Sequence, residues 1–236
     1  MFWTVVAYAL ALPLTVILAY LAFELLFGIA PLRSKQAPGN AKPAPHTAIL
    51  IPAHNEAGGI AETIADLRAS APDAFVLVVA DNCTDETARI AREAGADVTE
   101  RHDTQLRGKG FALAHGREVL SRSSDRRPSD TQPFDRQVFE AVIVIDADCR
   151  LAPGSAERLA RRVVDTGGPV QAANLLISQP DQPPLVAISN FAMLIKNLVR
   201  ARGLMRLGGG ASLFGTGMAF PWPMFARLQL ATDNAV

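Results

Sequence analysis

The sequence predicts an α/β fold with a mostly parallel central sheet and helices on both faces, preceded by one transmembrane helix. From His46 onward, short apolar runs alternate with helical patterns, which is typical of strand–helix units joined by right-handed crossovers. Ahead of them, residues 2–30 contain a single charged residue, Glu24. An apolar segment of this length can cross the hydrocarbon core of a bilayer.

Residues 1–30 are therefore expected to form a membrane anchor. No Lys or Arg precedes the apolar segment, whereas Arg33, Lys35 and Lys42 follow it. The positive-inside rule then places the rest of the chain in the cytoplasm. A cleaved secretory signal would need a basic N-terminal region, which is absent here. A buried core helix is the other alternative that the segment leaves open.

Residues 31–45 are rich in Pro, Lys and small residues and are expected to form a linker to one α/β domain at 46–236. The polar stretch Ser121–Arg136 is expected to form a surface loop. The expected strands are Thr47–Ala53, Phe75–Asp81, Asp97–Arg101, Ala141–Ala147 and Pro169–Leu175. The expected helices are Gly58–Ser70, Asp85–Glu93, Lys109–Arg122, Gly154–Asp165 and Leu185–Arg202.

The overall charge and the cysteines exclude several classes of protein. Lys plus Arg and Asp plus Glu number 23 each, and this balance argues against a nucleic-acid-binding protein. Cys83 and Cys149 are far apart and have no metal-ligand spacing. A disulfide framework is not expected, and a reducing compartment fits this composition best.

Two carboxylates, Asp146 and Asp148, directly follow the apolar run 141–145. A run of this kind is typical of a strand buried on both faces, and ligands of open α/β sheets bind at the carboxyl ends of such strands. Carboxylates two residues apart can share one divalent cation, Mg²⁺ or Mn²⁺, with a bound diphosphate. The simpler alternative is that Asp148 caps a turn and Asp146 is a solvated strand end.

Polar motifs also follow the first two expected strands. Glu56 comes after the first strand and Asp81 ends the second, so both should lie at the same sheet edge. Their carboxylates can accept hydrogen bonds from a base or a ribose. Thr84 or Asp85 can instead serve only to cap the next helix.

Lys109 opens an expected helix between two glycines, in Arg107-Gly108-Lys109-Gly110. The helix dipole disfavours a cation at this end, and this conflict favours an anionic ligand over a merely exposed lysine. The chain has neither a G-x-x-x-x-G-K-[ST] loop nor a G-x-G-x-x-G after the first strand. ATPase and NAD-binding interpretations therefore lose their main support.

Two later segments each allow two interpretations. The expected helix Leu185–Arg202 has apolar residues at helical spacing and a basic second half. This pattern favours a helix that packs its apolar face in the core and leaves its basic face in solvent. Contact of the basic face with anionic lipid headgroups is the alternative. The motif Gly215-Thr216-Gly217 is either a glycine turn into a buried strand or a wall beside an acceptor. Trp222 either stacks on a sugar or belongs to the core.

Taken in order, I-P-A-H-N-E, D-N-C-T-D, R-G-K-G, V-I-V-I-D-A-D and G-T-G-M-A-F-P-W resemble family 2 glycosyltransferases with a GT-A fold. The match covers residues 46–222 and is nearest to bacterial membrane-anchored cellulose, chitin and exopolysaccharide synthases. The resemblance implies a single-pass protein of the cell inner membrane with a cytoplasmic catalytic domain. It also implies a nucleotide-sugar donor, usually UDP-linked, a polysaccharide or lipid-linked acceptor, and Mn²⁺ or Mg²⁺.

The resemblance assigns roles to individual residues. The nucleotide site would comprise Pro52, His54, Glu56, Asp81, Lys109 and Asp146. Asp148, together with Asp146, would hold the metal, and Gly215, Thr216 and Gly217 would border the acceptor. An acceptor hydroxyl would attack the anomeric carbon from the face opposite the departing diphosphate and invert it.

The sequence departs from the family pattern near its C-terminus. The family carries an acidic general base after the G-T-G strand, commonly in an E-D pair, and many synthases carry Q-x-x-R-W later. Neither motif is found, and Asp233 is a poor substitute for the base. We therefore expect a truncated chain in which transfer is weakened, because a positioned base contributes roughly 10²–10⁴-fold. A truncated module that only binds donor or a partner is the alternative, and a nucleotidyltransferase is a weaker one.

Overall fold

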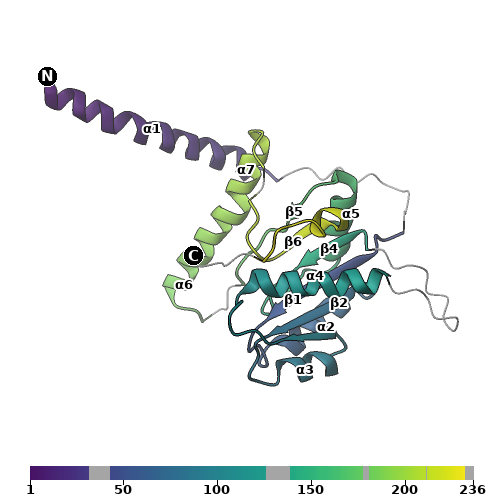
Figure 1. Cartoon of the computed structure of the whole chain (residues 1–236). Coiled ribbons are helices and arrows are strands. Elements are labelled where there is room, and N and C mark those ends of the chain that lie inside the picture. Colours follow the sequence, from purple (N-terminus) through teal and green to yellow (C-terminus); the bar gives the residue numbers. More distant parts are fainter. Residues whose placement is uncertain (32–42, 126–138, 178–180, 211, 232–236) are drawn as a thin grey trace, which may run out of the picture. The chain divides into compact units, whose positions relative to one another are not determined.

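The computed structural model describes residues 1–31, 43–125, 139–177, 181–210 and 212–231, with the side chains of 123–125 left aside (Figure 1). Most of the expected linker, most of the polar loop Ser121–Arg136 and Asp233 lie outside these residues. The chain divides into two compact units. We call residues 41–172 and 213–236 the sheet unit, and residues 1–40 and 173–212 the helical unit.

The sheet unit contains a six-stranded sheet with the order β3-β2-β1-β4-β6-β5. Its strands are β1 (Thr47–Ala53), β2 (Phe75–Asp81), β3 (Asp97–Arg101), β4 (Ala141–Val144), β5 (Val170–Gln171) and β6 (Met218–Pro221). The pairs β1–β2, β2–β3 and β1–β4 are parallel, whereas β6 runs antiparallel to both β4 and β5. The predicted mostly parallel α/β sheet is therefore confirmed.

Apolar side chains along β1 alternate between the two faces of the sheet, and helices cover both faces. Ile49 and Ile51 pack on the face covered by α2 (Ile60–Ser70), α3 (Thr87–Glu93) and α5 (Ser155–Thr166). Ala48 and Leu50 pack on the opposite face, under α4 (Lys109–Asp125) and α8 (Trp222–Phe225). Successive side chains of a strand point to opposite faces, so a continuous apolar run is buried on both.

Close packing of α4 depends on Gly116. A Cβ atom added there would lie 2.5 Å from Leu50 Cδ1 and 2.9 Å from Val79 Cγ2, which is closer than carbon atoms approach. The helix thus sits directly on β1 and β2. This contact fixes the N-terminus of α4, and with it Lys109, at the carboxyl edge of the sheet.

Two expected strands are shorter than predicted. The fourth ends at Val144, although Ile145 and Ala147 remain buried beyond it. The fifth is reduced to Val170–Gln171, because it is an edge strand that, among the described residues, pairs only with β6. Leu175, at its expected end, is exposed and belongs to the helical unit.

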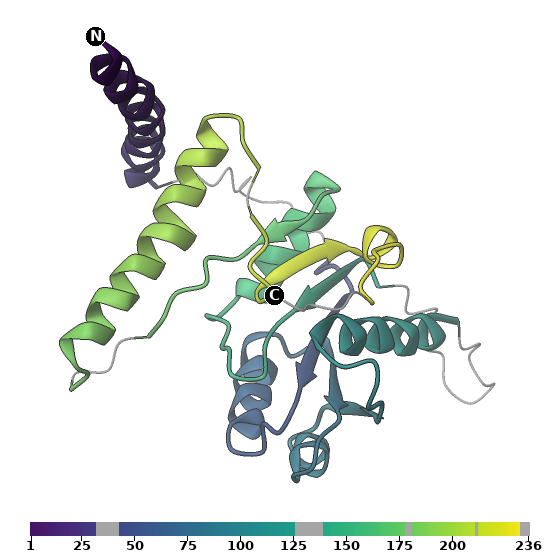
Figure 2. The same cartoon turned by 60° about the vertical axis from the view of Figure 1, so that its left-hand side comes forward.

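The helical unit contains α1 (Phe2–Ile29), which is long and apolar enough to cross a membrane by length and composition. Its second helical stretch comprises α6 (Pro184–Leu194), a π-helical segment (Ile195–Arg200) and α7 (Ala201–Arg206), drawn as one rod in Figure 2. The grouping of residues 173–212 with α1 differs from the linear division expected from the sequence.

The prediction that this second stretch packs its apolar face in a core is wrong for α6. Ile188 and Phe191 are 64% and 63% exposed, and no residue of α6 is buried. Helical periodicity reveals that a face is apolar but not what covers it. A glycine turn follows the helix, since α7 ends at Arg206 and Gly208 has φ +85°.

Candidate nucleotide and metal site

The loops after β1 and β2 are joined to each other by side-chain hydrogen bonds. Asn55 has φ +57°, and its Oδ1 accepts from Thr84 N at 2.8 Å. Asp85 Oδ2 accepts from Ala57 N at 3.1 Å, and Asp85 Oδ1 accepts from Thr87 N at 3.0 Å. Asp85 precedes the N-cap of α3, Glu86, so its side chain closes a local turn onto Thr87 N and fixes the first loop, and is not the cap itself. The loops lie together at the sheet edge, as predicted for adjacent parallel strands.

Asp81 is held in place before any ligand arrives. Its Oδ1 accepts from Arg101 at 2.7 Å and from Asn82 Nδ2 at 3.1 Å, and both partners of the ion pair are about nine-tenths buried. The Asp81 carbonyl contacts His54 Nδ1 at 2.7 Å. His54 is therefore a polar residue that joins two loops.

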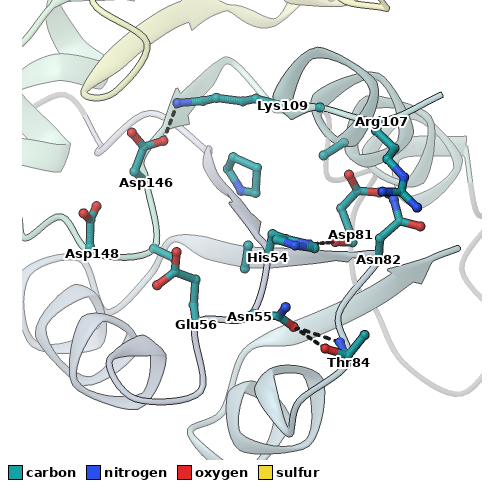
Figure 3. Close-up of a pocket in the computed structure, with 15 residues that line it drawn as sticks. His54, Asn55, Glu56, Asp81, Asn82, Thr84, Arg107, Lys109, Asp146 and Asp148 are labelled. Carbon is teal, nitrogen blue, oxygen red and sulfur yellow. Dashed lines mark hydrogen bonds and ion pairs between the residues drawn. The ribbon is translucent and has the colours of Figure 1, made fainter. Parts of the chain in front are cut away.

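Glu56 lies half-buried at the start of the turn that leads into α2. Its backbone N–H donates to Thr87 Oγ1 at 2.8 Å, so the position of the residue is fixed by the main chain. Among the described residues, its carboxylate has no ion-pair partner. It faces the cavity on the same side as Asp148 (Figure 3).

Lys109 joins the loop after β4 to the Gly215-Thr216-Gly217 loop. Its ammonium forms an ion pair with Asp146 and donates to the Gly215 carbonyl at 2.5 Å. The Asp146 backbone N–H in turn donates to Thr216 Oγ1 at 3.0 Å. Thr216 is buried, and Gly215 and Gly217 have φ of +86° and +66°, so this turn needs glycine at both positions.

Asp148 is exposed and carries no ion pair within the described part of the chain. One ligand atom from each of Asp146, Asp148 and Cys149 lies within 4.8 Å of the others. The loop that carries them is held by Thr63 Oγ1, which donates to the Ala147 carbonyl at 2.7 Å. Two carboxylates this close, one of them without a cationic partner, are a suitable donor set for a hard divalent cation.

The cysteines beside the site are not activated. Burial raises the pKa of both the Cys83 and the Cys149 thiol above the ordinary value. Both therefore remain protonated at neutral pH, and a neutral thiol is a poor nucleophile and a poor ligand for Mg²⁺ or Mn²⁺.

One cavity of about 680 Å³ collects most of the predicted site. Its lining includes Pro52, His54, Glu56, Asp81, Lys109, Asp146 and Asp148, which reach it from the ends of β1, β2 and β4 and from α4. In Figure 3, Glu56, Asp146 and Asp148 lie on one side of it, and Asp81 and Arg107 lie on the other. Gly215, Thr216 and Gly217 are not part of the lining, but Gly215 contacts Lys109 and Thr216 contacts Asp146.

Sequence reasoning missed two residues that position this site. Arg101 pairs with Asp81 because the two are direct neighbours in the β2–β3 register. The Gln171 side chain accepts from Phe214 N at 2.9 Å and donates to the Thr216 carbonyl at 2.8 Å, so it holds the glycine loop from β5. Only the strand pairing reveals either contact, since both partners are distant along the chain.

The chain matches a protein-family model, two curated proteins described here, and solved structures. The family model for glycosyl transferase family 2 matches residues 48–181. Protein RfbJ of Shigella flexneri is 43% identical over 63 residues, which are 27% of this chain and 46% of that protein. The low-salt glycan biosynthesis hexosyltransferase Agl6 of Haloferax volcanii is 40% identical over 75 residues, covering 30% of this chain and 17% of that protein.

Among solved structures, the mannosyltransferase PcManGT from Pyrobaculum calidifontis, in complex with GDP-Man and Mn²⁺, is 19% identical. The alignment covers 84% of this chain and 58% of that chain, with a TM-score of 0.48. The chain spans less than half the length of the curated relatives that it matches, and less than two thirds of this solved chain.

Proposed function

Because this chain belongs to glycosyl transferase family 2, with more than half of its residues in the matched region, we propose that it transfers a sugar from a nucleotide-diphosphate sugar, a UDP-sugar in the simplest case. The acceptor would be a polysaccharide or a lipid-linked glycan, and the anomeric carbon would be inverted. The cavity that collects Glu56, Asp81, Lys109 and Asp148 carries this proposal. The description of Agl6 as a hexosyltransferase of glycan biosynthesis is consistent with it.

In this proposal the nucleoside binds at the ends of β1 and β2. Arg101 and Asn82 occupy Asp81 Oδ1, so Oδ2 remains to accept from a base N–H or a ribose hydroxyl. Glu56, whose carboxylate has no ion-pair partner within the described residues, supplies a second acceptor. An acceptor that is already oriented by buried partners loses little freedom on binding, and this favours affinity.

The charge of the cavity supports a requirement for a metal ion. Of the four carboxylates in its lining, Asp81 and Asp146 are paired with Arg101 and Lys109. The other two, Glu56 and Asp148, have no ion-pair partner among the described residues, and Arg107 is the one further cation of the lining. A diphosphate entering such a lining would be repelled without an added cation. Asp148 and Asp146 would hold Mn²⁺ or Mg²⁺, which when bound offsets the negative charge that develops on the departing diphosphate.

Lys109 would link the donor to the glycine loop. Its ammonium now neutralises Asp146 and contacts the Gly215 carbonyl. A diphosphate would compete for the same ammonium, and Asp146 would then be released to serve the cation. Such an exchange would couple donor binding to the loop that we propose borders the acceptor.

We further propose that α1 anchors the protein in the cell inner membrane with the sheet unit in the cytoplasm. The length and composition of α1 support insertion, and the basic residues Arg33, Lys35 and Lys42 after it support the orientation. An anchor of this kind would keep the enzyme close to a lipid-linked or membrane-extruded acceptor.

Calorimetric titration of UDP in the presence of Mn²⁺ tests the donor site through Asp148→Asn. Binding does not require the general base, which the sequence does not reveal, so it is a better readout than turnover. Asp148→Asn should abolish the Mn²⁺-dependent part of binding, whereas Asp165→Asn, on the exposed face of α5, should retain it. Unchanged binding by Asp148→Asn would refute the site. Binding without transfer to any acceptor would favour the alternative of a donor-binding module.

A further inference from the structure

The helical unit exposes an unusual amount of apolar side chain on α6. Leu185, Ile188 and Phe191 are 72%, 64% and 63% exposed, and Pro184–Leu194 contains no charged residue. Leu175, Leu176 and Ile177, shortly before the helix, are also exposed. A helix without a polar face is normally buried in a protein core or in lipid. Contiguous apolar surface of this kind marks a site of interaction.

The same helical stretch is firmly joined to the C-terminal end of α1. Arg200 Nε donates to Glu24 at 2.8 Å, and the Glu24 side chain is only 3% exposed. Arg206 donates to the Ala30 and Pro31 carbonyls at 2.8 and 2.9 Å. The basic residues of the second half therefore serve to neutralise the charged residue of α1 and to cap its free carbonyls.

Glycines allow the two backbones to touch at this joint. A Cβ atom at Gly203 would lie 1.8 Å from the Glu24 carbonyl oxygen, and one at Gly28 would lie 1.9 Å from the Val199 carbonyl oxygen. Neither position can carry a larger residue without separating the helices. Close crossing at small residues is characteristic of helices that associate in or at a membrane.

The joint fixes where α6 must lie if α1 crosses the bilayer. Glu24 and Gly28 are in the last two turns of α1, where the chain leaves the apolar region. From that point α7, the π-helical segment and α6 run as one continuous helix, which crosses the end of α1 and does not run alongside it (Figures 1 and 2). The exposed side chains of α6 are thereby held at the level of the membrane surface.

We propose that α6, together with residues 175–177, is a second membrane-contacting element that lies in the interface of the bilayer entered by α1. The occupant of the apolar face is thus the lipid bilayer itself. Residues 182–212 contain no acidic residue, which suits the anionic headgroups of a cytoplasmic leaflet. The inference rests on the proposed anchoring by α1, and it does not depend on the sugar-transfer activity.

Photo-crosslinking of the full chain in vesicles of phosphatidylethanolamine and phosphatidylglycerol tests this directly. Phe191 is replaced by p-benzoylphenylalanine, which inserts into the C–H bonds of whatever lies against it. Leu14, in the middle of α1, is the position expected to contact lipid, and Glu93, exposed on α3, is the position expected to face water. Ile188, a second exposed position of α6, is replaced in a separate variant, so that the test remains possible if the Phe191 variant does not fold.

We expect phospholipid adducts, detected as a mass increase, at Phe191, Ile188 and Leu14, and none above background at Glu93. No adduct at Phe191 and Ile188 while Leu14 reacts with lipid would overturn the proposal. A crosslink to a second copy or to another segment of the chain would overturn it in favour of a protein partner. If Leu14 also failed to react with lipid, the anchor and this proposal would both be wrong. UDP binding by the same samples reports on the proposed donor site independently.

Discussion

Replacing Arg101 by Met should be one of the most destabilising single changes near the site. Arg101 and Asp81 form an ion pair at 2.7 Å in which the side chains are 11% and 10% exposed. Arg101 also donates to the Leu106 carbonyl at 2.5 Å, and its guanidinium lies 5.7 Å from the centre of the Phe111 ring. Methionine retains much of the aliphatic packing but leaves the Asp81 carboxylate buried without its cation.

The size of the expected loss of stability follows from the burial of this ion pair. Removing one partner of a buried ion pair costs about 3–5 kcal/mol, because the remaining charge is desolvated and unpaired. Arg89 offers a matched control, since it pairs with Glu86 and Glu93 but is 56% exposed. Exposed pairs of that kind contribute little to stability, because water and salt screen them. For a domain of this size, a loss of about 3 kcal/mol lowers Tm by roughly 6–12 °C.

Urea denaturation of the wild type, Arg101→Met and Arg89→Met in the same detergent measures the difference. Asp81→Leu, alone and combined with Arg101→Met, completes a thermodynamic cycle. The double variant should recover part of the stability lost in Arg101→Met, with a coupling energy of ~1–3 kcal/mol. If Arg101→Met cost no more than Arg89→Met, Asp81 would not be desolvated. Asp81 would then not be a pre-oriented hydrogen-bond acceptor.

Three further predictions concern other parts of the site. Gln171→Leu should lower the free energy of unfolding by about 1–3 kcal/mol, because it leaves backbone groups of the glycine loop unsatisfied. Denaturation beside Gln105→Leu, an exposed control, checks this, and equal losses would contradict it. Hydrogen bonds from Thr87 lower the pKa of Asp85 below its ordinary 3.8, so its stabilisation is present above that pH and is lost as the pH falls through the lowered pKa. Acid unfolding should therefore be shallower in Asp85→Ala than in the wild type, and an unchanged pH dependence would refute the role. Burial raises the pKa of the Cys83 and Cys149 thiols, so iodoacetamide should modify the folded chain more slowly than free cysteine at pH 8, and equal rates would show that the thiols are not shielded.

The sequence was most informative where continuous apolar runs end in polar residues. The limits of β1, β2 and β3 agree with the prediction, because each of these strands is bounded by turn residues and carries its own pattern. β5 was overestimated because an edge strand with one partner is limited by the length of that partner, here β6. No local pattern contains this information.

The residues of the site also divide into those that the sequence reveals and those that only the structure reveals. The carboxylates and Lys109 could be found from the sequence because strand ends point to one edge of a parallel sheet. The contacts that hold them could not, since Arg101 reaches Asp81 through the β2–β3 register and Gln171 reaches the glycine loop across β6. The exposure of α6 was missed for a related reason. Its apolar pattern is satisfied equally by a protein core and by lipid.

The most direct test of the central claim is calorimetric titration of UDP and GDP into the purified chain, with Mn²⁺ and with EDTA. We expect UDP to bind only when Mn²⁺ is present, because the carboxylates of the cavity repel a diphosphate that has no accompanying cation. Tighter binding of GDP than of UDP would show that the site prefers guanine to uracil, and would not contradict the proposed diphosphate site. Absence of binding to a demonstrably folded chain, or equal binding in EDTA, would contradict the proposed metal-dependent donor site.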